Sequence, residues 1–515
     1  MNVHGDKTSA SQRAVKDTGK LFLAHLGAGA CSIAFTAWLL RLVPDWGLAL
    51  WPVCISLGGA ISAFGSLGMG DSFVRIVPDL IARGRRREAA ALMRTGLLLN
   101  AVACAVLAVA LWLFAEPIAR VLLHSPDMAL YVRPLAVAAF FTGLRDRLGW
   151  GLTAVQEFGK QAILRFGIDV LRSPLAVVCY KWVGAPGLLL ALTVVPMAAC
   201  LLSLYWLQPH LRTGGTWQAP GSIVRFSWPY YGVSVSGFLE GQAHYLVVGV
   251  LGGPTILAPY FVAYRLAEYL RSLDRMAVTA VTPKLTERAG AQPEKRPRVF
   301  AKCMRYLFVG MLPLHVGAAA LAGPLIALYG GAGYGGAANV FAVLCLGFFV
   351  ETFYGVHRAH IQVFARPVQL LLLEVVAGVA TVGGLLLFVP PLGALGAAVS
   401  ALVVAVGLSL AGILLLRHTM SLRYDTAAAT WATVGSLAVA AIAWSLQELL
   451  GNHGLGVIGA TFVAGALAYL ALLVSKLTAE DLDVFLGALP PVVWRNGVGQ
   501  RFQRLLGALA AARQA

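Results

Sequence analysis

The residues best suited to chemistry are charged side chains inside long apolar segments, and the segment 254–280 carries the most. Arg265, Glu268 and Arg271 follow one another at intervals of three, and Asp274 and Arg275 come one turn later. At helical spacing, neighbouring opposite charges form ion pairs. A guanidinium group also binds phosphate or carboxylate oxygens through two parallel hydrogen bonds. The segment is therefore either an internal ladder of ion pairs or part of an anion site, with Arg265 and Arg271 as ligands.

A second arginine of this kind is Arg172, in the apolar segment 163–182, with Asp169 three residues before it. A carboxylate at that spacing lies beside the arginine on a helix and can neutralise it. The two readings are a structural ion pair near one face of the membrane and a second ligand for an anion. Arg172 joins Arg265 and Arg271 as a predicted binding residue.

Isolated carboxylates form a third group. Glu240, Glu351 and Glu374 each lie inside an apolar segment, and Glu240 shares a helix face with His244. A charge at the centre of a membrane span costs roughly 2.5–3.5 kcal/mol, so such residues usually face the protein interior and have a role. We predict Glu240, Glu351, Glu374 and Asp169 as candidates for carrying a coupling proton or binding Na⁺.

The elements that position these residues are membrane-spanning helices. The chain has 515 residues, of which 59% are apolar and 12% charged, against about 25% charged in soluble domains. Apolar runs of roughly 20 residues, enough to cross a bilayer, return along the whole sequence. We predict an all-α protein with about fourteen spans, at 21–43, 47–68, 95–115, 130–152, 163–182, 186–207, 224–250, 254–280, 303–323, 337–358, 368–389, 393–416, 427–449 and 456–475.

Lysine and arginine set the orientation. With the N-terminus inside, the inside segments hold 32 of the 40 lysine and arginine residues, and the outside segments hold four. Arg145 and Arg147 are counted with the inside segments. Positive charge concentrates on the cytoplasmic side of membrane proteins. We therefore expect a multi-pass protein of a bacterial inner membrane with both ends in the cytoplasm. Helical spacing of basic and apolar residues at 501–506 predicts an amphipathic helix on the membrane surface.

Several classes of protein are excluded. The net charge of +17 lies mainly between the apolar runs, which makes it topogenic and argues against nucleic-acid binding. The seven cysteines form no CxxC pair, so we expect neither a disulfide nor a metal site. The sequence has no P-loop, no H-E-x-x-H and no G-x-S-x-G. We predict no enzyme and no cofactor.

The two halves of the chain resemble each other. Residues 74–94 and 279–299 each precede an apolar run that ends alike, with AEPIARVLL (115–123) and AGPLIALYG (322–330). Further on, paired phenylalanines precede QEFGKQAIL (156–164) and QVFARPVQL (362–370). The offset of six spans is even, so the halves run parallel and substrate is expected between them. The predicted parts are a cytoplasmic N-terminus (1–20), an N-lobe (21–215), a C-lobe (216–417), an added helix pair (418–476) and a cytoplasmic tail (477–515).

Six short motifs point to a known family: Gly68–Gly70, 83–96, Gly252–Pro254, Tyr260–Leu266, Val281–Leu285 and Gly323–Ile326. Through them, from about residue 20 to 475, the chain resembles the polysaccharide-transport branch of the multidrug/oligosaccharidyl-lipid/polysaccharide exporter superfamily. The resemblance implies a flippase for lipid-linked oligosaccharides, with two six-helix lobes around a central cationic cavity and alternating access. Its implied partners are a polyprenyl-pyrophosphate-linked oligosaccharide, membrane lipids, and a polymerase and glycosyltransferases of the same pathway.

Three alternatives stay open. A multidrug antiporter of the same superfamily predicts an acidic cavity, and Arg265 and Arg172 argue against it. A peptidoglycan-precursor flippase predicts more cationic residues in the first two spans, which here hold only His25 and the terminal Arg41. A glycan polymerase or ligase predicts a long outside loop, and the outside loops are short.

Overall fold

The computed structural model describes residue 27 and residues 29–212, 220–291, 296–364, 367–417, 424–451 and 454–476, and all regular structure in them is helical. The prediction of an all-α fold is confirmed. The predicted N-terminal segment (1–20) and the amphipathic tail (477–515) lie outside the described residues.

The first half begins with a helix at Gly29–Leu42. It continues with α2 (Asp45–Phe64), α3 (Met69–Ala82), α4 (Arg86–Leu113), α5 (Ala115–Leu122), the 3₁₀ turn η1 (Pro126–Met128), α6 (Ala129–Ala154), α7 (Phe158–Val183) and α8 (Ala185–Leu211). Helix α3 occupies part of the stretch between the predicted spans 47–68 and 95–115, for which no span was predicted. A break at Leu67 and Gly68, both with positive φ, separates α3 from α2.

The second half repeats this order. It consists of α9 (Pro220–Gly241), α10 (Ala243–Ala291), α11 (Arg296–Ala320), α12 (Ala322–Gly330), the 3₁₀ turn η3 (Ala332–Tyr334), α13 (Ala337–Phe364), α14 (Pro367–Leu392) and α15 (Ala394–Arg417). The final pair is α16 (Thr426–Leu450) and α17 (Leu455–Lys476). These two helices pack on each other, and α16 packs on α11.

Eleven of the described helices are long and apolar enough to cross a membrane: α2, α4, α6, α8, α10, α11, α13, α14, α15, α16 and α17. The other three predicted spans correspond to the 14-residue helix Gly29–Leu42, to α7, which contains five charged residues, and to α9. The count of fourteen therefore stays a prediction.

The predicted span 224–250 is wrong as a single continuous helix. Helix α9 ends at Gly241, and the chain bends at Gln242 before α10 begins. The hydroxyl of Ser56 on α2 donates to the Gln242 carbonyl at 2.7 Å, which satisfies that oxygen without the regular helical bond. Within α10, Gly253 has φ 60° and ψ −165°, a conformation that only glycine adopts readily. Gly253 lies between the predicted seventh and eighth spans, where the sequence placed their boundary.

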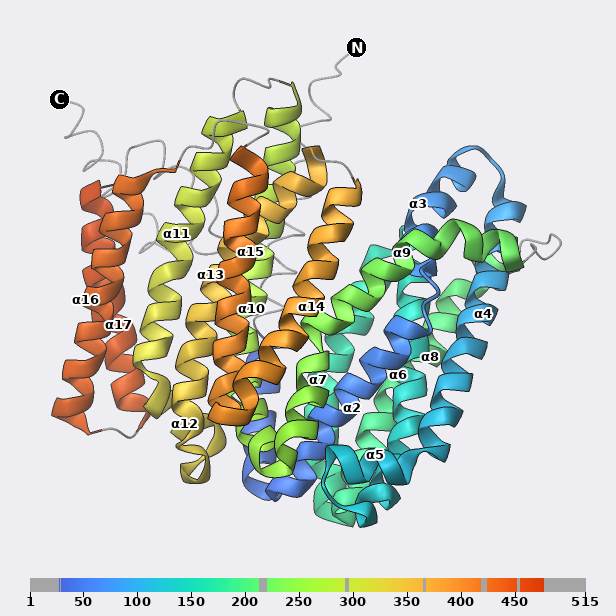
Figure 1. Ribbon diagram of the computed structural model, residues 1–515, viewed down its shortest axis with the longest axis horizontal. Coiled ribbons are helices and arrows are strands. Elements are labelled where there is room, and N and C mark those ends of the chain that lie inside the picture. The colour runs from blue at the N-terminus through green and yellow to red at the C-terminus, as the bar shows by residue number, and fades with distance from the viewer. Residues whose placement is uncertain are drawn as a thin grey trace, which may run out of the picture.

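The helices form two bundles that meet at one end and diverge toward the other (Figure 1). At the joined end, which carries α5 and α12, the Arg41 guanidinium donates to the Leu328 carbonyl at 2.5 Å. The Tyr334 hydroxyl donates to Asp45 Oδ1 at 2.6 Å. We refer to these two hydrogen bonds as the outer contact, because the distribution of positive charge predicts that this end faces outward.

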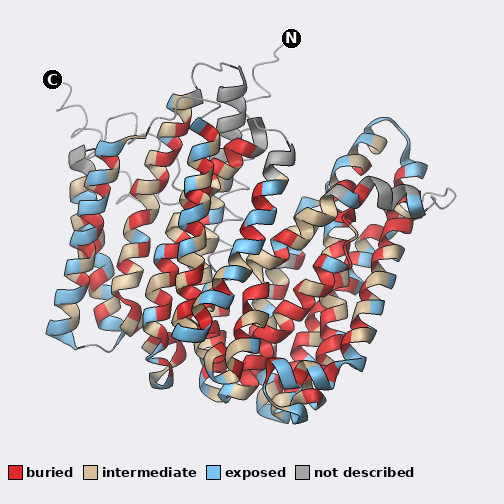
Figure 2. Ribbon diagram, viewed as in Figure 1, coloured by how far each residue is buried: buried red, intermediate tan, exposed pale blue. Residues whose placement is uncertain are grey.

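Apolar residues on the outward faces of the bundles are exposed (Figure 2). On α4, the side chains of Leu98, Val102, Val106, Val109 and Leu113 are between 52% and 72% exposed. Their spacing of three to four residues forms one stripe along the helix. A stripe of this kind is stable against lipid and unfavourable in water.

The internal repeat extends to single residues. Gly184 and Gly393, both with positive φ, turn α7 into α8 and α14 into α15. A Cβ on Gly187 would lie 2.0 Å from the Cys179 carbonyl oxygen, and a Cβ on Gly396 would lie 1.9 Å from that of Phe388. The members of each glycine pair are 209 positions apart. Both hairpins therefore close in the same way, with backbone against backbone.

The same offset relates two side-chain contacts. Cys200 of α8 contacts the Phe141 carbonyl of α6 at 3.3 Å, and Ser409 of α15 donates to the Val350 carbonyl of α13 at 3.3 Å. Each pair member again lies 209 positions from its equivalent. The repeat predicted from loose sequence matches is therefore present in the packing of the helices.

Candidate functional site

A cavity of about 760 Å³, here called the central cavity, lies between the two halves. Its walls come from the helix Gly29–Leu42, from α2, α6, α7 and α8, and from α10 of the second half. Seven charged residues are among those lining it: Arg145, Asp146, Arg147, Arg172, Arg265, Glu268 and Arg275. Five guanidinium groups face two carboxylates, so the described lining is cationic.

Two of the predicted anion ligands, Arg172 and Arg265, line this cavity from opposite halves. Arg172 is 11 residues from the end of α7 at Val183, and Arg265 is 12 residues from the break at Gly253. At 1.5 Å per residue each guanidinium-bearing residue is about 16–18 Å from the outer end, close to the middle of a bilayer. The fold brings together two arginines 93 positions apart in sequence.

Each arginine is held by its own helix or a neighbour. Arg265 Nη1 is 2.7 Å from Glu268 Oε2, and its guanidinium carbon lies 5.4 Å from the Tyr269 ring centre. The guanidinium carbon of Arg172 lies 5.5 Å from the Trp51 ring centre. Cation–π contacts of this kind orient a guanidinium group without neutralising its charge. Asp169 belongs to α7, but its side chain is outside the described residues.

Arg145 and Arg147 also line the central cavity, although the sequence counted them in an inner loop. The structure places both within α6. Arg145 Nη2 is 2.6 Å from Asp146 Oδ1, and Arg147, which is buried, donates to Ser62 Oγ at 2.9 Å. The predicted span 130–152 contains both residues, so the sequence already indicated that they lie within a membrane-spanning helix.

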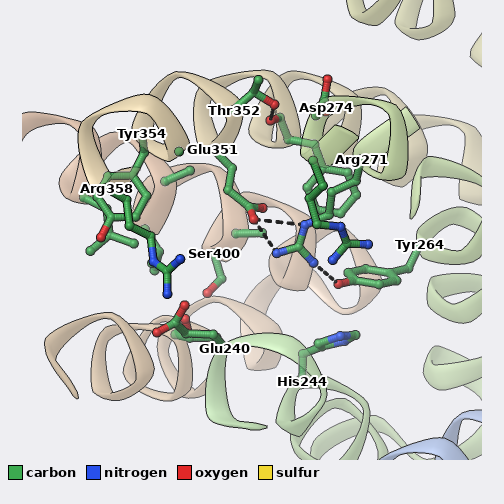
Figure 3. A pocket seen from close by; sticks show the side chains of 18 of the residues that line it. Glu240, His244, Tyr264, Arg271, Asp274, Glu351, Thr352, Tyr354, Arg358 and Ser400 are labelled. Atoms are coloured by element: carbon green, nitrogen blue, oxygen red, sulfur yellow. Dashed lines mark hydrogen bonds and ion pairs between the residues drawn. The ribbon is translucent and has the colours of Figure 1, made fainter. Parts of the chain in front are cut away.

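A second cavity of about 450 Å³, here called the C-half cavity, lies among α9, α10, α13, α14 and α15 (Figure 3). Arg271 lies here and not in the lining of the central cavity. It donates from Nε to Glu351 Oε1 at 3.0 Å and from Nη1 to the Tyr264 hydroxyl at 2.9 Å. Its charge is thus met by a carboxylate from a helix 80 positions away.

The other predicted carboxylates differ in whether an arginine pairs with them. Glu374 is buried and lies 2.5 Å from Arg358 Nε. Glu240 points toward Arg358 and Ser400 across the C-half cavity (Figure 3). Its buried Oε1 has no hydrogen-bond partner among the described residues. Glu240 is therefore the carboxylate of this group with spare capacity to take up a cation.

The two cavities differ in charge. The C-half cavity is lined by the arginines Arg271, Arg275 and Arg358 and by the carboxylates Glu240, Asp274 and Glu351, so its described charges balance. The central cavity has an excess of three positive charges. An anionic ligand is therefore favoured in the central cavity, and the C-half cavity suits a small cation or proton.

Residues 80–339, just over half of the chain, match the model of a family described as polysaccharide biosynthesis protein. The chain belongs to this family. No curated protein sequence matches it.

Solved transporter structures share the fold of this polysaccharide biosynthesis protein. The lipid II flippase MurJ, in an inward closed conformation, aligns with a TM-score of 0.72 and 10% identity over 88% of this chain and 97% of that chain. A multidrug resistance MATE family transporter of the MOP superfamily, inward-facing, aligns with a TM-score of 0.58 and 19% identity over 76% and 95%. A MOP superfamily transporter from Pyrococcus furiosus, described as having a binding pocket of reverse polarity, aligns with a TM-score of 0.51 and 18% identity over 76% of this chain and 92% of that chain.

These likenesses establish the fold. The chain is a multi-pass membrane protein with the architecture of MOP superfamily transporters, and the family predicted from the sequence is confirmed.

Proposed function

We propose that this protein is a flippase that moves a polyprenyl-pyrophosphate-linked oligosaccharide from the inner to the outer leaflet of the bacterial cytoplasmic membrane. The oligosaccharide is destined for a surface polysaccharide such as lipopolysaccharide or exopolysaccharide. Both chain ends face the cytoplasm, and the polymerase and glycosyltransferases of the pathway are its functional partners. Transport, and not bond chemistry, is the activity.

The observation that carries the proposal is the charge of the central cavity. A pyrophosphate carries at least two negative charges, and moving it across the apolar core without compensation is prohibitively costly. Arg172 and Arg265, at mid-depth on opposite halves, supply guanidinium groups where that cost is greatest. Arg145 and Arg147 extend the positive lining along α6. A cation-selective antiporter is disfavoured by the same charges.

Alternating access follows from the two bundles. In the described conformation they are joined at the outer contact and diverge at the other end (Figure 1), which leaves the central cavity available to an inner-leaflet head group. Breaking the outer contact and closing the opposite end would present the head group to the outer leaflet. Because the arginines contact the head group in both states, they offset its desolvation on either side of the movement.

The coupling ion is assigned to the C-half cavity. Of the carboxylates predicted from the sequence, Glu240 has the most capacity to take up a cation, because its Oε1 has no hydrogen-bond partner among the described residues. Glu351 and Glu374 are candidates that must first leave Arg271 and Arg358. Arg271 contributes to substrate binding only if that pair opens, and Asp169 stays a candidate by its position beside Arg172.

The test is flipping of a fluorescent pyrophosphoryl-lipid sugar by the purified protein in liposomes. We expect Arg265→Ala and Arg172→Ala each to lower the rate at least tenfold, since a guanidinium–phosphate interaction contributes about 1.5–3 kcal/mol. Arg133→Ala is the control, because Arg133 is exposed near the outer end of α6. Wild-type rates in both cavity variants would refute the anion site.

A peptidoglycan-precursor flippase is the second candidate. The observation in its favour is the extent of the alignment with the lipid II flippase MurJ, which covers 88% of this chain. Because the anionic part of both substrates is a pyrophosphate, the arginines do not separate them. Competition between probes with a peptide-bearing and a peptide-free head group does, and we expect the peptide-free probe to be moved faster.

A further inference from the structure

Asp274 and His315 form a buried pair that neither the predicted coupling residues nor the arginine lining includes. Asp274 is on α10 and His315 on α11, and their side chains are 3% and 1% exposed. Asp274 Oδ2 lies 3.1 Å from His315 Nε2. Neither oxygen of this carboxylate, nor Nε2 of His315, has a hydrogen-bond partner among the described residues.

The tautomer of His315 is determined by its other nitrogen. Nδ1 lies 2.9 Å from the backbone carbonyl of Met311. A carbonyl oxygen only accepts hydrogen bonds, so Nδ1 must carry a hydrogen. In a neutral imidazole Nε2 then has a bare lone pair. That lone pair would face an ionised carboxylate at 3.1 Å, which places two acceptors against each other in a buried site.

One additional proton removes this conflict. It can lie on Nε2, giving an imidazolium beside a carboxylate, or on Oδ2, giving a neutral acid beside a neutral imidazole. Either arrangement turns the close approach of α10 and α11 at this point from repulsive to attractive. The 3.1 Å separation therefore favours a proton held on this pair of side chains.

The charged groups around the pair do not take the place of this proton, and the pair adjoins the C-half cavity. On α10 the nearest charges are Arg271, which is bonded to Glu351 of α13, and Arg275. Other titratable or charged groups on the packed helices include Cys345 and Arg358 on α13, Glu374 on α14, and Glu240 and His244 in the lining of the C-half cavity. Helix α11 itself also carries Lys302, Cys303 and Arg305. Asp274 itself lines that cavity (Figure 3). Because its carboxylate oxygens and His315 Nε2 are buried, release of the proton requires the two side chains to move apart.

We propose that Asp274 and His315 form a proton-binding site whose occupancy is coupled to the movement of the two halves. This rests on the proposed function and names its coupling ion. On release, the proton passes to water in the C-half cavity, leaving a carboxylate and a neutral imidazole that repel each other. Helix α10 also carries Arg265, nine residues or about 13 Å away. Loss of the proton thus acts on the helix that contacts the head group.

The test compares Asp274→Asn with wild type in the liposome assay, with and without a pH gradient. The asparagine amide donates to Nε2 without an extra proton, so the α10–α11 contact is kept while proton exchange is lost. For one proton per cycle, we expect an outside-acid gradient of one pH unit to raise the ratio of outward to inward flipping about tenfold in wild type. We expect no gradient response in Asp274→Asn or in His315→Gln.

His357→Gln is the matched control. His357 also bonds a backbone carbonyl through Nδ1, that of Phe353 at 2.9 Å. Its Nε2, however, faces the Tyr424 hydroxyl at 2.9 Å, which can donate, so no additional proton is needed. We expect His357→Gln to keep the wild-type gradient response. A wild-type response in Asp274→Asn and His315→Gln would overturn the proposal.

A second measurement separates this proposal from the proposed function. If the folded protein holds a proton that the unfolded chain releases, stability falls as pH rises. In detergent we expect wild-type Tm to fall with rising pH more than that of Asp274→Asn. If the wild-type protein moves no pyrophosphate-lipid at any pH, the proposed flippase function is wrong. If wild type and Asp274→Asn show the same dependence of Tm on pH, the proposed proton site is wrong.

Discussion

The outer contact allows a quantitative prediction about alternating access. Tyr334→Phe removes the hydroxyl that donates to Asp45 Oδ1 at 2.6 Å and leaves the ring in place. Tyr334 is buried, while Asp45 is exposed, so water compensates part of the loss on the carboxylate. We take about 0.5–1.5 kcal/mol, the range for an ordinary hydrogen bond. Since 1.4 kcal/mol is a factor of ten, the population with separated outer ends should rise by about 2- to 12-fold.

The assay is the distance between two spin labels at the outer ends of the bundles. Arg120 on α5 is 66% exposed and Leu455 at the start of α17 is 71% exposed, so cysteines at these positions accept labels. Six of the seven native cysteines are buried, which limits labelling of the background. We expect Tyr334→Phe to increase the long-distance population in lipid.

The control for this measurement is Tyr205→Phe. Tyr205 is 70% exposed on α8, far from the outer contact in sequence, and its hydroxyl does not join the two halves. Unchanged distance distributions in Tyr334→Phe would show that the hydrogen bond does not hold the outer ends together. An equal shift in the distance distribution of Tyr205→Phe would show that the change does not depend on the hydrogen bond between Tyr334 and Asp45.

Two further predictions concern stability, both measured as Tm in detergent. Gly396→Ala should lower Tm by several degrees, because its Cβ would lie 1.9 Å from the Phe388 carbonyl oxygen and overpacking costs about 1–3 kcal/mol. The control Gly407→Ala should leave Tm unchanged, because there is open space around Gly407. Equal effects of the two substitutions would refute the close contact at Gly396. Glu351→Gln should lower Tm, because it removes the charged partner of Arg271, whose side chain is 14% exposed. Breaking a fully buried ion pair costs about 3–5 kcal/mol, and the cost is smaller here because Glu351 is 35% exposed. An unchanged Tm would contradict the pairing.

Hydropathy and periodicity could predict most of the fold. Apolar runs determine where helices cross, and Gly253 falls where two predicted spans meet. The bend at Gln242 could not be predicted, because it depends on a hydrogen bond from Ser56, 186 positions earlier. Likewise, hydropathy does not indicate α3, because its charged and apolar residues lie on different faces of the helix and give no continuous apolar run.

The site was predictable one helix at a time. Placing Arg172 and Arg265 inside predicted spans was sufficient to nominate them, and the parallel repeat placed substrate between the halves. Which charges pair across helices was not accessible: the sequence grouped Arg271 with its neighbours on α10, whereas its partner is Glu351. The pair of Asp274 and His315 depends on how α10 and α11 pack, and no local spacing encodes that.

The tight turn between α7 and α8 has a consequence for biosynthesis of the protein. Helix α7 contains five charged residues and is not among the helices apolar enough to span a membrane alone, whereas α8 has a mean hydropathy of 2.3. With only Gly184 between them, the two helices cannot enter the bilayer at separate times. We expect the insertion machinery to receive them as one hairpin, in which α8 provides the favourable transfer free energy and α7 carries Arg172 to mid-membrane. A longer linker at Gly184 would then impair membrane integration before it affected transport.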